Sequence, residues 1–384
     1  MKYLSQEKLC NKKVILRCDF NVPVKDGKIT DNSKIIKSLK TINYLLDNNN
    51  MVIILSHFGR VKNESDKENN SLYIVYEELK KYVNVDFIKN NEQIENILKN
   101  SNKQCFLLEN TRFTDLPIKR ESANDIELAK YWASFADIFV LDAFASMHRA
   151  HSSTAGIGNF LPTYIGFLAE SEFKNLDLLV NNPNRPFVVI MGGAKVDDKI
   201  DIIINMIKKC DKLILTGGIL NTFLKVMGFN VGKSLVSCDE KVLNNVKLII
   251  DNYIDKIFYS NKFIVLSGEN ILEKSIEEII DDDIIFDNIV NIYEHLSKAK
   301  LAFFNGTCGK FEEKEYSKGT ENLLKELREC SAKVIIGGGD TVSAVIKYHF
   351  ENDFYYLSSG GGATLEYVST GHLKAIDYLE NNGI

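Results

Sequence analysis

Residues 333–350 read KVIIGGGDTVSAVIKYHF. The continuously apolar run at 334–336 predicts a buried strand, and the amphipathic segment after Asp340 predicts a helix. Between them lie Gly337, Gly338 and Gly339, which have no side chain to keep a ligand away from the backbone. Unpaired N–H groups at the start of the helix can therefore bind an anion. The stretch predicts an α/β fold with a phosphate-type site where a strand ends.

The same order of apolar strand, polar or glycine-rich turn and helix recurs along the chain. This repetition predicts parallel sheets built from βαβ units, with helices covering both faces. We expect two doubly wound, Rossmann-like parallel sheets, with ligands at the carboxyl ends of the strands. The predicted strand segments are 12–20, 50–60, 103–113, 136–144, 185–195, 211–218, 262–268, 300–306, 332–340 and 354–363.

A chain of 384 residues exceeds what one hydrophobic core usually organises. The segment 164–185 reads as one amphipathic helix that ends at the Asn-Asn-Pro of residues 181–183. We therefore expect an N-terminal domain over 1–163, a joining helix over 164–185 and a C-terminal domain over 186–371.

The composition excludes several classes of protein. Hydrophobic residues make up 45% and charged residues 26%, which is ordinary for a globular protein. A net charge of −5 favours neither nucleic acid nor an anionic membrane as a partner. We expect a cytoplasmic protein, because no signal peptide or long apolar run is visible. The seven cysteines contain no CxxC pair, which predicts reduced thiols.

Two further loops of the C-terminal half suit phosphate. FYYLSSGGGATLEY places Gly361 before a second helix start, and MGGAKVDDK places Lys195 and Lys199 four residues apart, which predicts both on one helix face. Asp340 can hold Mg²⁺ against phosphate oxygens. Each loop alone is equally a common structural turn, and Asp340 alone could be a helix cap. Three loops in one lobe indicate nucleotide binding.

Two other nucleotide motifs fail on spacing. GFNVGKS at 228–234 is one residue short of a P-loop, and no GxGxxG occurs at any glycine cluster. P-loop and dinucleotide-dependent enzymes therefore lose their main support.

The strand ends of the N-terminal half supply polar and basic side chains. Taken singly, each arginine is as readily explained by a surface ion pair. The set, however, is expected at one edge of one sheet, where the side chains would form a pocket for a small polyanion. Phosphoryl transfer between this anion and a bound nucleotide follows as the predicted chemistry. The residues are Asp19, Asn21, His57, Arg60, Arg112 and Arg149.

Taken in order, these motifs resemble the phosphoglycerate kinase family over essentially the whole chain. The resemblance implies a bilobed, hinge-bending monomer that binds 3-phosphoglycerate in its N-terminal lobe and ADP or ATP with Mg²⁺ in its C-terminal lobe. It also implies that residues 372–384 return to the N-terminal lobe. The matching stretches are RCDFNVPVKDGKITDNSKI, SHFGR, LLENTRF, DAFASMHRAHSST, RPFVVIMGGAKVDDKI, GFNVGKSLV, FNGTCGKFE, IIGGGDTVSAV and SSGGGATLEY.

The resemblance also implies roles for individual residues, with the metal at Asp340. Its implied contacts to phosphoglycerate fall on Asp19, Asn21, Lys34, His57, Arg60, Arg112 and Arg149. Its implied nucleotide contacts fall on Lys199, Asn305, Glu312, Gly338, Gly339, Asp340 and Thr341. Its implied catalytic groups, around the transferring phosphoryl, fall on Lys34, Lys195, Gly338 and Gly361.

The chain departs from the family pattern at Lys34, where the family has an arginine at the transferring phosphoryl, and at Thr307, where it has a proline. Lysine keeps the charge but loses the bidentate fork. The leading hypothesis is a working kinase that interconverts 1,3-bisphosphoglycerate and ADP with 3-phosphoglycerate and ATP in glycolysis. The alternatives are a nucleotide-binding pseudoenzyme and a kinase for another small acid.

Overall fold

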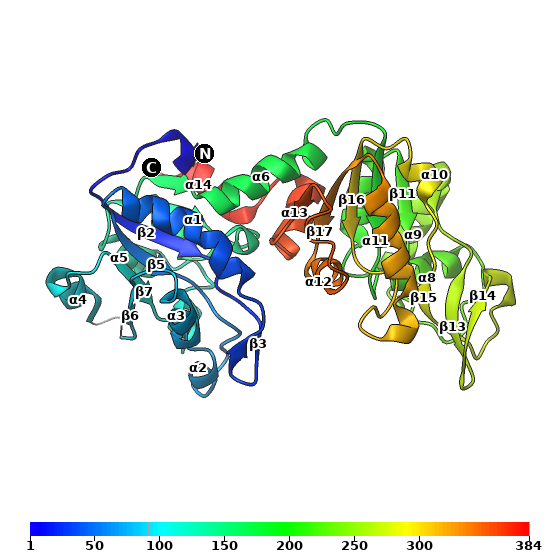
Figure 1. Cartoon of the computed structure of the whole chain (residues 1–384), viewed down its shortest axis with the longest axis horizontal. Helices are drawn as coiled ribbons and strands as arrows, with labels where there is room; N and C mark the ends of the chain where they lie inside the picture. The colour runs from blue at the N-terminus through cyan, green and yellow to red at the C-terminus, as the bar shows by residue number, and fades with distance from the viewer. Residues whose placement is uncertain (91–92, 384) are drawn as a thin grey trace. The chain divides into compact units, whose positions relative to one another are not determined.

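The computed structural model describes residues 1–90 and 93–383 and divides the chain into two compact units (Figure 1). Unit 1 contains Met1–Lys174 together with the segment that begins at His372, and unit 2 contains Asn175–Gly371. The boundary between Lys174 and Asn175 falls inside one helix, α6 (Phe167–Val180). Helix α6 therefore contains residues of both units, and it lies within 164–185, the range of the predicted joining helix.

Unit 1 is built on a parallel sheet with seven strands among the described residues, in the order β1-β9-β8-β2-β5-β7-β6. The strands are β1 (Lys2–Tyr3), β9 (Thr163–Ile165), β8 (Ile138–Asp142), β2 (Lys13–Cys18), β5 (Met51–Leu55), β7 (Cys105–Leu108) and β6 (Asp86–Ile88). Strands β5, β7 and β6 lie on one side of β2 and β8 and β9 on the other, so the chain winds to both sides of β2, as in a doubly wound sheet. The predicted fold class is confirmed for this unit.

Helix α1 (Ser33–Asp47) shows how the helices bind to this sheet. Its buried residues Ile35, Ile42 and Leu45 recur at helical spacing and pack in one cluster with Val14 and Leu16 of β2. Each such side chain stabilises the fold by roughly 1.5–3 kcal/mol. The remaining elements of unit 1 are α2 (Asp66–Asn69), α3 (Tyr73–Leu79), α4 (Ile94–Asn100), α5 (Ile126–Ala133), α14 (Lys374–Asn382) and the hairpin β3 (Val24–Lys25) and β4 (Lys28–Ile29).

The C-terminal helix α14 is fastened to unit 1 by specific contacts. The backbone N–H of Ala375 donates to the carbonyl of Met147 at 2.9 Å, and the amide of Asn159 donates to the Tyr378 hydroxyl at 2.8 Å. A side chain at Gly158 would meet a methyl group of Leu379 at 2.1 Å, so the helix packs directly on backbone. Helix α14 therefore supports the loop in which Met147 lies.

Unit 2 contains a second parallel sheet, with six strands among the described residues, in the order β12-β11-β10-β16-β17-β18. The strands are β12 (Ile257–Phe258), β11 (Lys212–Leu215), β10 (Phe187–Met191), β16 (Leu301–Asn305), β17 (Lys333–Gly337) and β18 (Tyr356–Leu357). The order again runs outward from a central strand, β10, so the prediction of a second doubly wound sheet is also confirmed.

Helices again cover the sheet of unit 2. Leu323 and Leu327 of α11 and Val345 of α12 join a cluster with Phe304 and Ile336 of the sheet. The helices of the unit are α7 (Ile200–Lys209), α8 (Gly217–Val226), α9 (Glu240–Tyr253), α10 (Tyr293–Leu296), α11 (Lys318–Glu329), α12 (Gly339–Lys347) and α13 (Gly362–Thr370). In neither unit is any described helix long and apolar enough to cross a bilayer.

One strand does not belong where the sequence predicts it. The run at 262–268 is expected in a parallel sheet, but β13 (Phe263–Ser267) lies in a separate antiparallel sheet with β14 (Asn270–Lys274) and β15 (Ile284–Asn288). Gly268 adopts a φ of +60°, which allows a two-residue turn straight into β14 instead of a crossover helix. The prediction for this segment is therefore wrong.

Candidate active site in two parts

The carboxyl edge of the sheet in unit 1 gathers the predicted anion-binding residues. Strands β8, β2, β5 and β7 are neighbours and parallel, so the loops that follow them meet at one edge. The loop after β2 contains Asp19 and Asn21, the loop after β5 contains His57 and Arg60, and the loops after β7 and β8 contain Arg112 and Arg149.

Lys34, in the first turn of α1, lies against the loop after β2. Its Nζ donates to Oδ2 of Asp19 at 2.8 Å and to the carbonyl of Asn21 at 3.2 Å. Although burial alone would raise it, the charge of Lys34 lowers the pKa of Asp19 to about 2. Asp19 is therefore ionised at neutral pH and holds the Lys34 ammonium in place. The side-chain oxygen of Asn21 accepts from the N–H of Gly59 at 2.9 Å, which ties this loop to the next one.

A fully buried arginine lies beneath the pocket. Arg17 is the only charged residue of strand β2 that is fully buried, with an exposed fraction of 0%. One of its guanidinium nitrogens lies 3.1 Å from Nδ1 of His57. Burial and then the charge of Arg17 hold the pKa of His57 well below its usual range. Because the guanidinium can only donate, a neutral His57 accepts at Nδ1 and keeps its proton on Nε2. His57 is therefore a preset hydrogen-bond donor.

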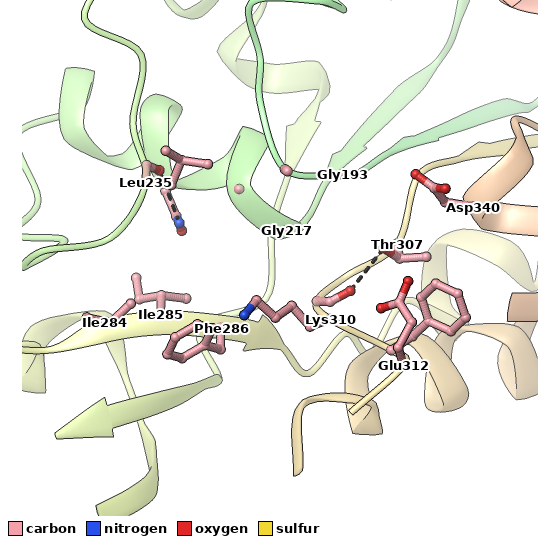
Figure 2. Close-up of a pocket in the computed structure, with 15 residues that line it drawn as sticks. Gly193, Gly217, Leu235, Ile284, Ile285, Phe286, Thr307, Lys310, Glu312 and Asp340 are labelled. Atoms are coloured by element: carbon pink, nitrogen blue, oxygen red, sulfur yellow. Dashed lines mark hydrogen bonds between the residues drawn. The ribbon is translucent and has the colours of Figure 1, made fainter. Parts of the chain in front are cut away.

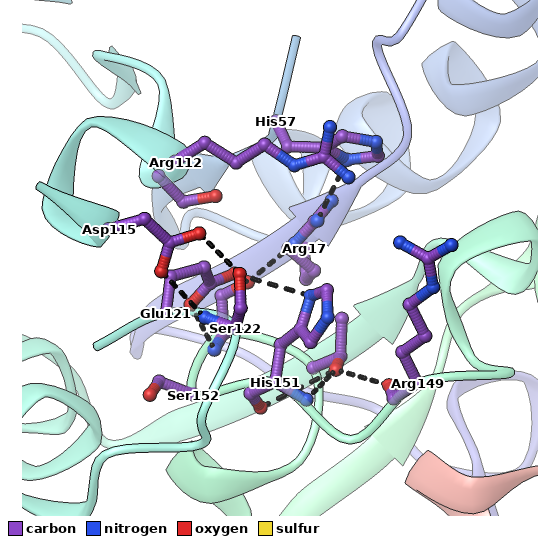
Figure 3. Close-up of polar contacts among 12 residues, drawn as sticks. Arg17, His57, Arg112, Asp115, Glu121, Ser122, Arg149, His151 and Ser152 are labelled. Atoms are coloured by element: carbon purple, nitrogen blue, oxygen red, sulfur yellow. Dashed lines mark hydrogen bonds and ion pairs between the residues drawn. The ribbon is translucent and has the colours of Figure 1, made fainter. Parts of the chain in front are cut away.

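The other side of Arg17 is balanced by a buried carboxylate (Figure 3). Nε of Arg17 donates to the Ser153 hydroxyl at 2.9 Å, and the N–H of Ser153 donates to Glu121 at 3.1 Å. Nδ1 of His151 lies 4.0 Å from the same carboxylate. Burial, and then the charge of Arg17, lowers the pKa of His151 to about 4, so this imidazole is neutral. Glu121 is therefore a buried carboxylate whose charge balances that of Arg17.

The arginines around the pocket repel one another. Burial and then the neighbouring guanidinium groups of Arg149 and Arg17 lower the pKa of Arg112. The side chains of Arg60 and Arg149 are exposed, and Figure 3 shows Arg112 and Arg149 on either side of Arg17. Like charges this close destabilise each other, whereas an anion bound among them relieves the repulsion. The arrangement is therefore that of an anion receptor.

Sequence reasoning misses Arg17 and Glu121 as parts of this site. The signal for Arg17 is present in KVILRC, because an arginine inside a buried strand requires a partner. Glu121 offers no such signal. Its partner Ser153 lies 32 positions away, so only the folded chain brings them together.

In unit 2, the glycine turn between β17 and α12 has the predicted form. Gly338 caps α12 at a φ of +95°, and a Cβ there would lie 2.3 Å from the amide nitrogen of Asn305. That amide donates to the carbonyl of Gly337 at 2.7 Å, and Gly306 N–H donates to the Thr341 hydroxyl at 2.7 Å. Asn305 and Thr341 thus fix the turn, which leaves the neighbouring Gly339 and Asp340 exposed.

The two lysines of the MGGAKVDDK loop do not share a helix face. Helix α7 begins at Ile200, so Lys195 and Lys199 both lie in the turn before it, and the predicted helical spacing is wrong. Nζ of Lys199 donates to the carbonyl of Gly192 at 2.7 Å. Burial lowers the pKa of Lys199 to about 8, although Asp340 opposes this shift. Lys195 lines a separate small pocket. The two glycines of this loop let the chain turn sharply between strand β10 and helix α7.

Gly361 lies at the corresponding place on the next strand. It caps α13 at a φ of +54°, just beyond β18, which pairs with β17. The starts of α12 and α13 therefore follow neighbouring parallel strands and open at the same edge of the sheet.

A pocket of about 300 Å³ lies at this edge (Figure 2). At one end are the apolar side chains of Leu235, Ile284 and Phe286, and at the other are Glu312 and Asp340. The backbones of Gly193, Gly217 and Gly218 form part of the wall, which lets a flat ring approach closely. A pocket with an apolar end and a polar end fits a nucleotide.

The donor set for a metal ion in this pocket is small. No cluster of three or more histidine, cysteine, aspartate or glutamate side chains occurs among the described residues. Two oxygen ligands lie near the Gly338 turn. Asp340 is exposed, and Oδ1 of Asn305 is buried and has no hydrogen-bond partner in residues 1–90 and 93–383. Mg²⁺ typically binds through one or two carboxylates, water and substrate phosphates. The residues therefore fit Mg²⁺ that arrives with a nucleotide.

An anion receptor on one α/β unit and a nucleotide-shaped pocket on another define the class of two-domain phosphotransferases. Three comparisons then specify the class. The family model for phosphoglycerate kinase matches residues 4–371. Phosphoglycerate kinases of Fusobacterium nucleatum and Staphylococcus epidermidis are 39% and 40% identical to this chain, and each alignment covers 99% of both chains. The structure of phosphoglycerate kinase from Coxiella burnetii matches with a TM-score of 0.85 and 35% identity, over 99% of this chain and 98% of that one. The chain belongs to the phosphoglycerate kinase family.

Proposed function

We propose that this protein transfers a phosphoryl group reversibly between 1,3-bisphosphoglycerate and ADP on one side and 3-phosphoglycerate and ATP on the other, in glycolysis. The observation that supports this most strongly is the surplus of cations around Arg17 at the sheet edge of unit 1. 3-Phosphoglycerate has both a phosphate and a carboxylate, and it relieves the repulsion within that pocket.

In the proposed complex, unit 1 binds phosphoglycerate. Arg60, Arg112 and Arg149 offer planar forks to its phosphate and carboxylate oxygens. His57 donates from Nε2, because its Nδ1 faces Arg17. Asn21 and Asp19 face the polar groups of the glycerate, and Asp19 also orients Lys34. We assign this role to residues 1–163 with 372–384.

Unit 2 binds the nucleotide, in the region 186–371 beyond the joining helix at 164–185. The base enters the apolar end of the pocket beside Phe286, and Glu312 accepts hydrogen bonds from the ribose hydroxyls. The phosphates lie at the start of α12, beside Gly338, Gly339 and Thr341, and Lys199 supplies positive charge. Asn305 holds the turn beneath them.

Asp340 is the residue that would hold Mg²⁺. Held there, Mg²⁺ would supply positive charge to the nucleotide phosphates and to the transferring phosphoryl group. The charge of Asp340 acts on the pKa of Lys199, so the two side chains lie near each other. Asp340 would then face the metal ion, and Lys199 would face the nucleotide phosphates.

The transfer itself requires no general base. A carboxylate oxygen of 3-phosphoglycerate attacks the terminal phosphorus of ATP, the new P–O bond forms as the bond to the bridging oxygen breaks, and ADP leaves as an anion. Catalysis is then a matter of position and charge, supplied by Lys34, Lys195 and the N–H groups at Gly338 and Gly361.

Lys34 does not favour a pseudoenzyme. Its ammonium keeps the positive charge of the family's arginine and is bound to Asp19 of the anion pocket. We further propose a monomer in the cytoplasm, which agrees with seven free thiols and a net charge of −5.

The experiment is a coupled assay of the purified protein with ATP, Mg²⁺ and increasing 3-phosphoglycerate. We expect saturable turnover that is competitively inhibited by inorganic sulfate, because both anions need the same arginines. Turnover with other small carboxylic acids but not with 3-phosphoglycerate would contradict the proposal.

A further inference from the structure

A buried amide in the wall of the nucleotide pocket has an unused acceptor. Asn221 of α8 is 2% exposed and lines the pocket. Its Nδ2 donates to the carbonyl of Leu235 at 3.4 Å. Its Oδ1 is buried and has no hydrogen-bond partner in the part of the chain that the structure describes. A buried acceptor without a donor destabilises the protein, unless a ligand supplies the donor.

The orientation of this amide follows from its neighbour. If the amide were rotated by 180°, Oδ1 would face the Leu235 carbonyl, and two acceptors would repel each other. The observed orientation therefore turns the nitrogen to Leu235 and leaves the oxygen for another partner. Leu235 itself is half exposed at the apolar end of the pocket, together with Ile284 and Phe286 (Figure 2). The unused acceptor thus belongs to the end that suits a base.

We propose that Asn221 is a specificity-determining residue that selects 6-aminopurine nucleotides, by accepting a hydrogen bond from the exocyclic amino group of the base. A 6-oxopurine presents a lone pair at that position, and two acceptors would then face each other in a desolvated pocket. A buried site that accepts a hydrogen bond from a ligand's N–H group rejects analogues without that group, because its own acceptor is then left unpaired. This inference rests on the proposed function, because it needs the base at the apolar end of the pocket.

The test measures binding by calorimetry of the full chain with MgCl₂ and three ligands: ADP, inosine diphosphate and purine riboside diphosphate. Inosine diphosphate changes the 6-amino group to a 6-oxo group, and purine riboside diphosphate has neither. For the unaltered protein we expect ADP to bind at least about tenfold more tightly than inosine diphosphate, with purine riboside diphosphate between them. In Asn221→Leu the three affinities should agree within about threefold. The control Asn244→Leu makes the same change at an exposed position of α9 and should keep the full preference.

Equal affinity of the unaltered protein for ADP and inosine diphosphate would overturn the inference, and this comparison needs no variant. A preference that persists in Asn221→Leu would also overturn it, because the selection would then reside elsewhere. Failure of the proposed function looks different, since ADP itself would give no binding heat.

Discussion

Replacing Lys34 by arginine should make the protein a faster phosphotransferase. The ammonium of Lys34 has three N–H donors, and two of them are directed at Asp19 and at the Asn21 carbonyl, at 2.8 and 3.2 Å. One donor therefore remains for an oxygen of the transferring phosphoryl. A guanidinium has five donors, so it can keep the Asp19 contact and still direct two parallel N–H groups at the phosphoryl.

The gain is one additional charge-assisted hydrogen bond, which forms best as charge develops on the moving group. Such bonds contribute roughly 1.5–3 kcal/mol, and ordering the longer side chain offsets part of this. A net gain of about 1.4 kcal/mol corresponds to about a tenfold rise in kcat. Because the contact belongs mainly to the transition state, KM for 3-phosphoglycerate should change by less than about threefold.

The assay is steady-state turnover of Lys34→Arg against the unaltered chain, with both substrates saturating. The matched control is Lys37→Arg, the same substitution at an exposed position of the same helix, which should leave kcat within about twofold. An unchanged or lower kcat in Lys34→Arg, with a normal control, would refute the reasoning that donor count limits this site.

Three further predictions concern unit 2. Asp340→Ala should lower kcat by about two orders of magnitude, around 3 kcal/mol, and lower ADP affinity by much less; equal losses in turnover and in calorimetric affinity would argue against a metal role. On binding ADP at pH 8 the protein should take up about half a proton, because the pKa of Lys199 is about 8 and bound phosphate favours its charged form. Calorimetry in buffers of different ionisation enthalpy measures this uptake, and Lys199→Arg should abolish it. Gly338→Ala should destabilise the ligand-free protein by about 2–3 kcal/mol in urea, because of its φ of +95° and the contact with Asn305, whereas Gly339→Ala, with open space around it, should change it by less than about 1 kcal/mol.

Much of the architecture follows from local patterns in the sequence. Apolar runs followed by glycine or polar turns predict both parallel sheets, because a strand covered by helices on both faces has no polar side. The segment at 262–268 has the same pattern, yet it forms a hairpin. The positive φ of Gly268 decides that outcome, and an apolar run alone does not encode it.

The site is predictable where residues follow strand ends and not where they meet through packing. Asp19, His57 and Arg112 are found by topology alone, since parallel strands align their carboxyl ends. Glu121 balances Arg17 through Ser153, and this pairing depends on how a loop folds back across the sheet. The three-dimensional fold is needed to see that charge balance.

The most direct measurement is transfer of the terminal phosphoryl of γ-³²P-labelled ATP to 3-phosphoglycerate in a single turnover, with Mg²⁺ and enzyme in excess. The account predicts label in the acyl phosphate of 1,3-bisphosphoglycerate, which hydroxylamine releases as labelled inorganic phosphate while the acyl group forms an unlabelled hydroxamate, and no such label without 3-phosphoglycerate. In Arg112→Met, which removes one cation of the pocket, the label transferred at low 3-phosphoglycerate should fall by more than about tenfold. Label retained in ATP by the unaltered chain, or a transfer unaffected by Arg112→Met, would contradict the claim that the basic pocket of unit 1 binds the acceptor.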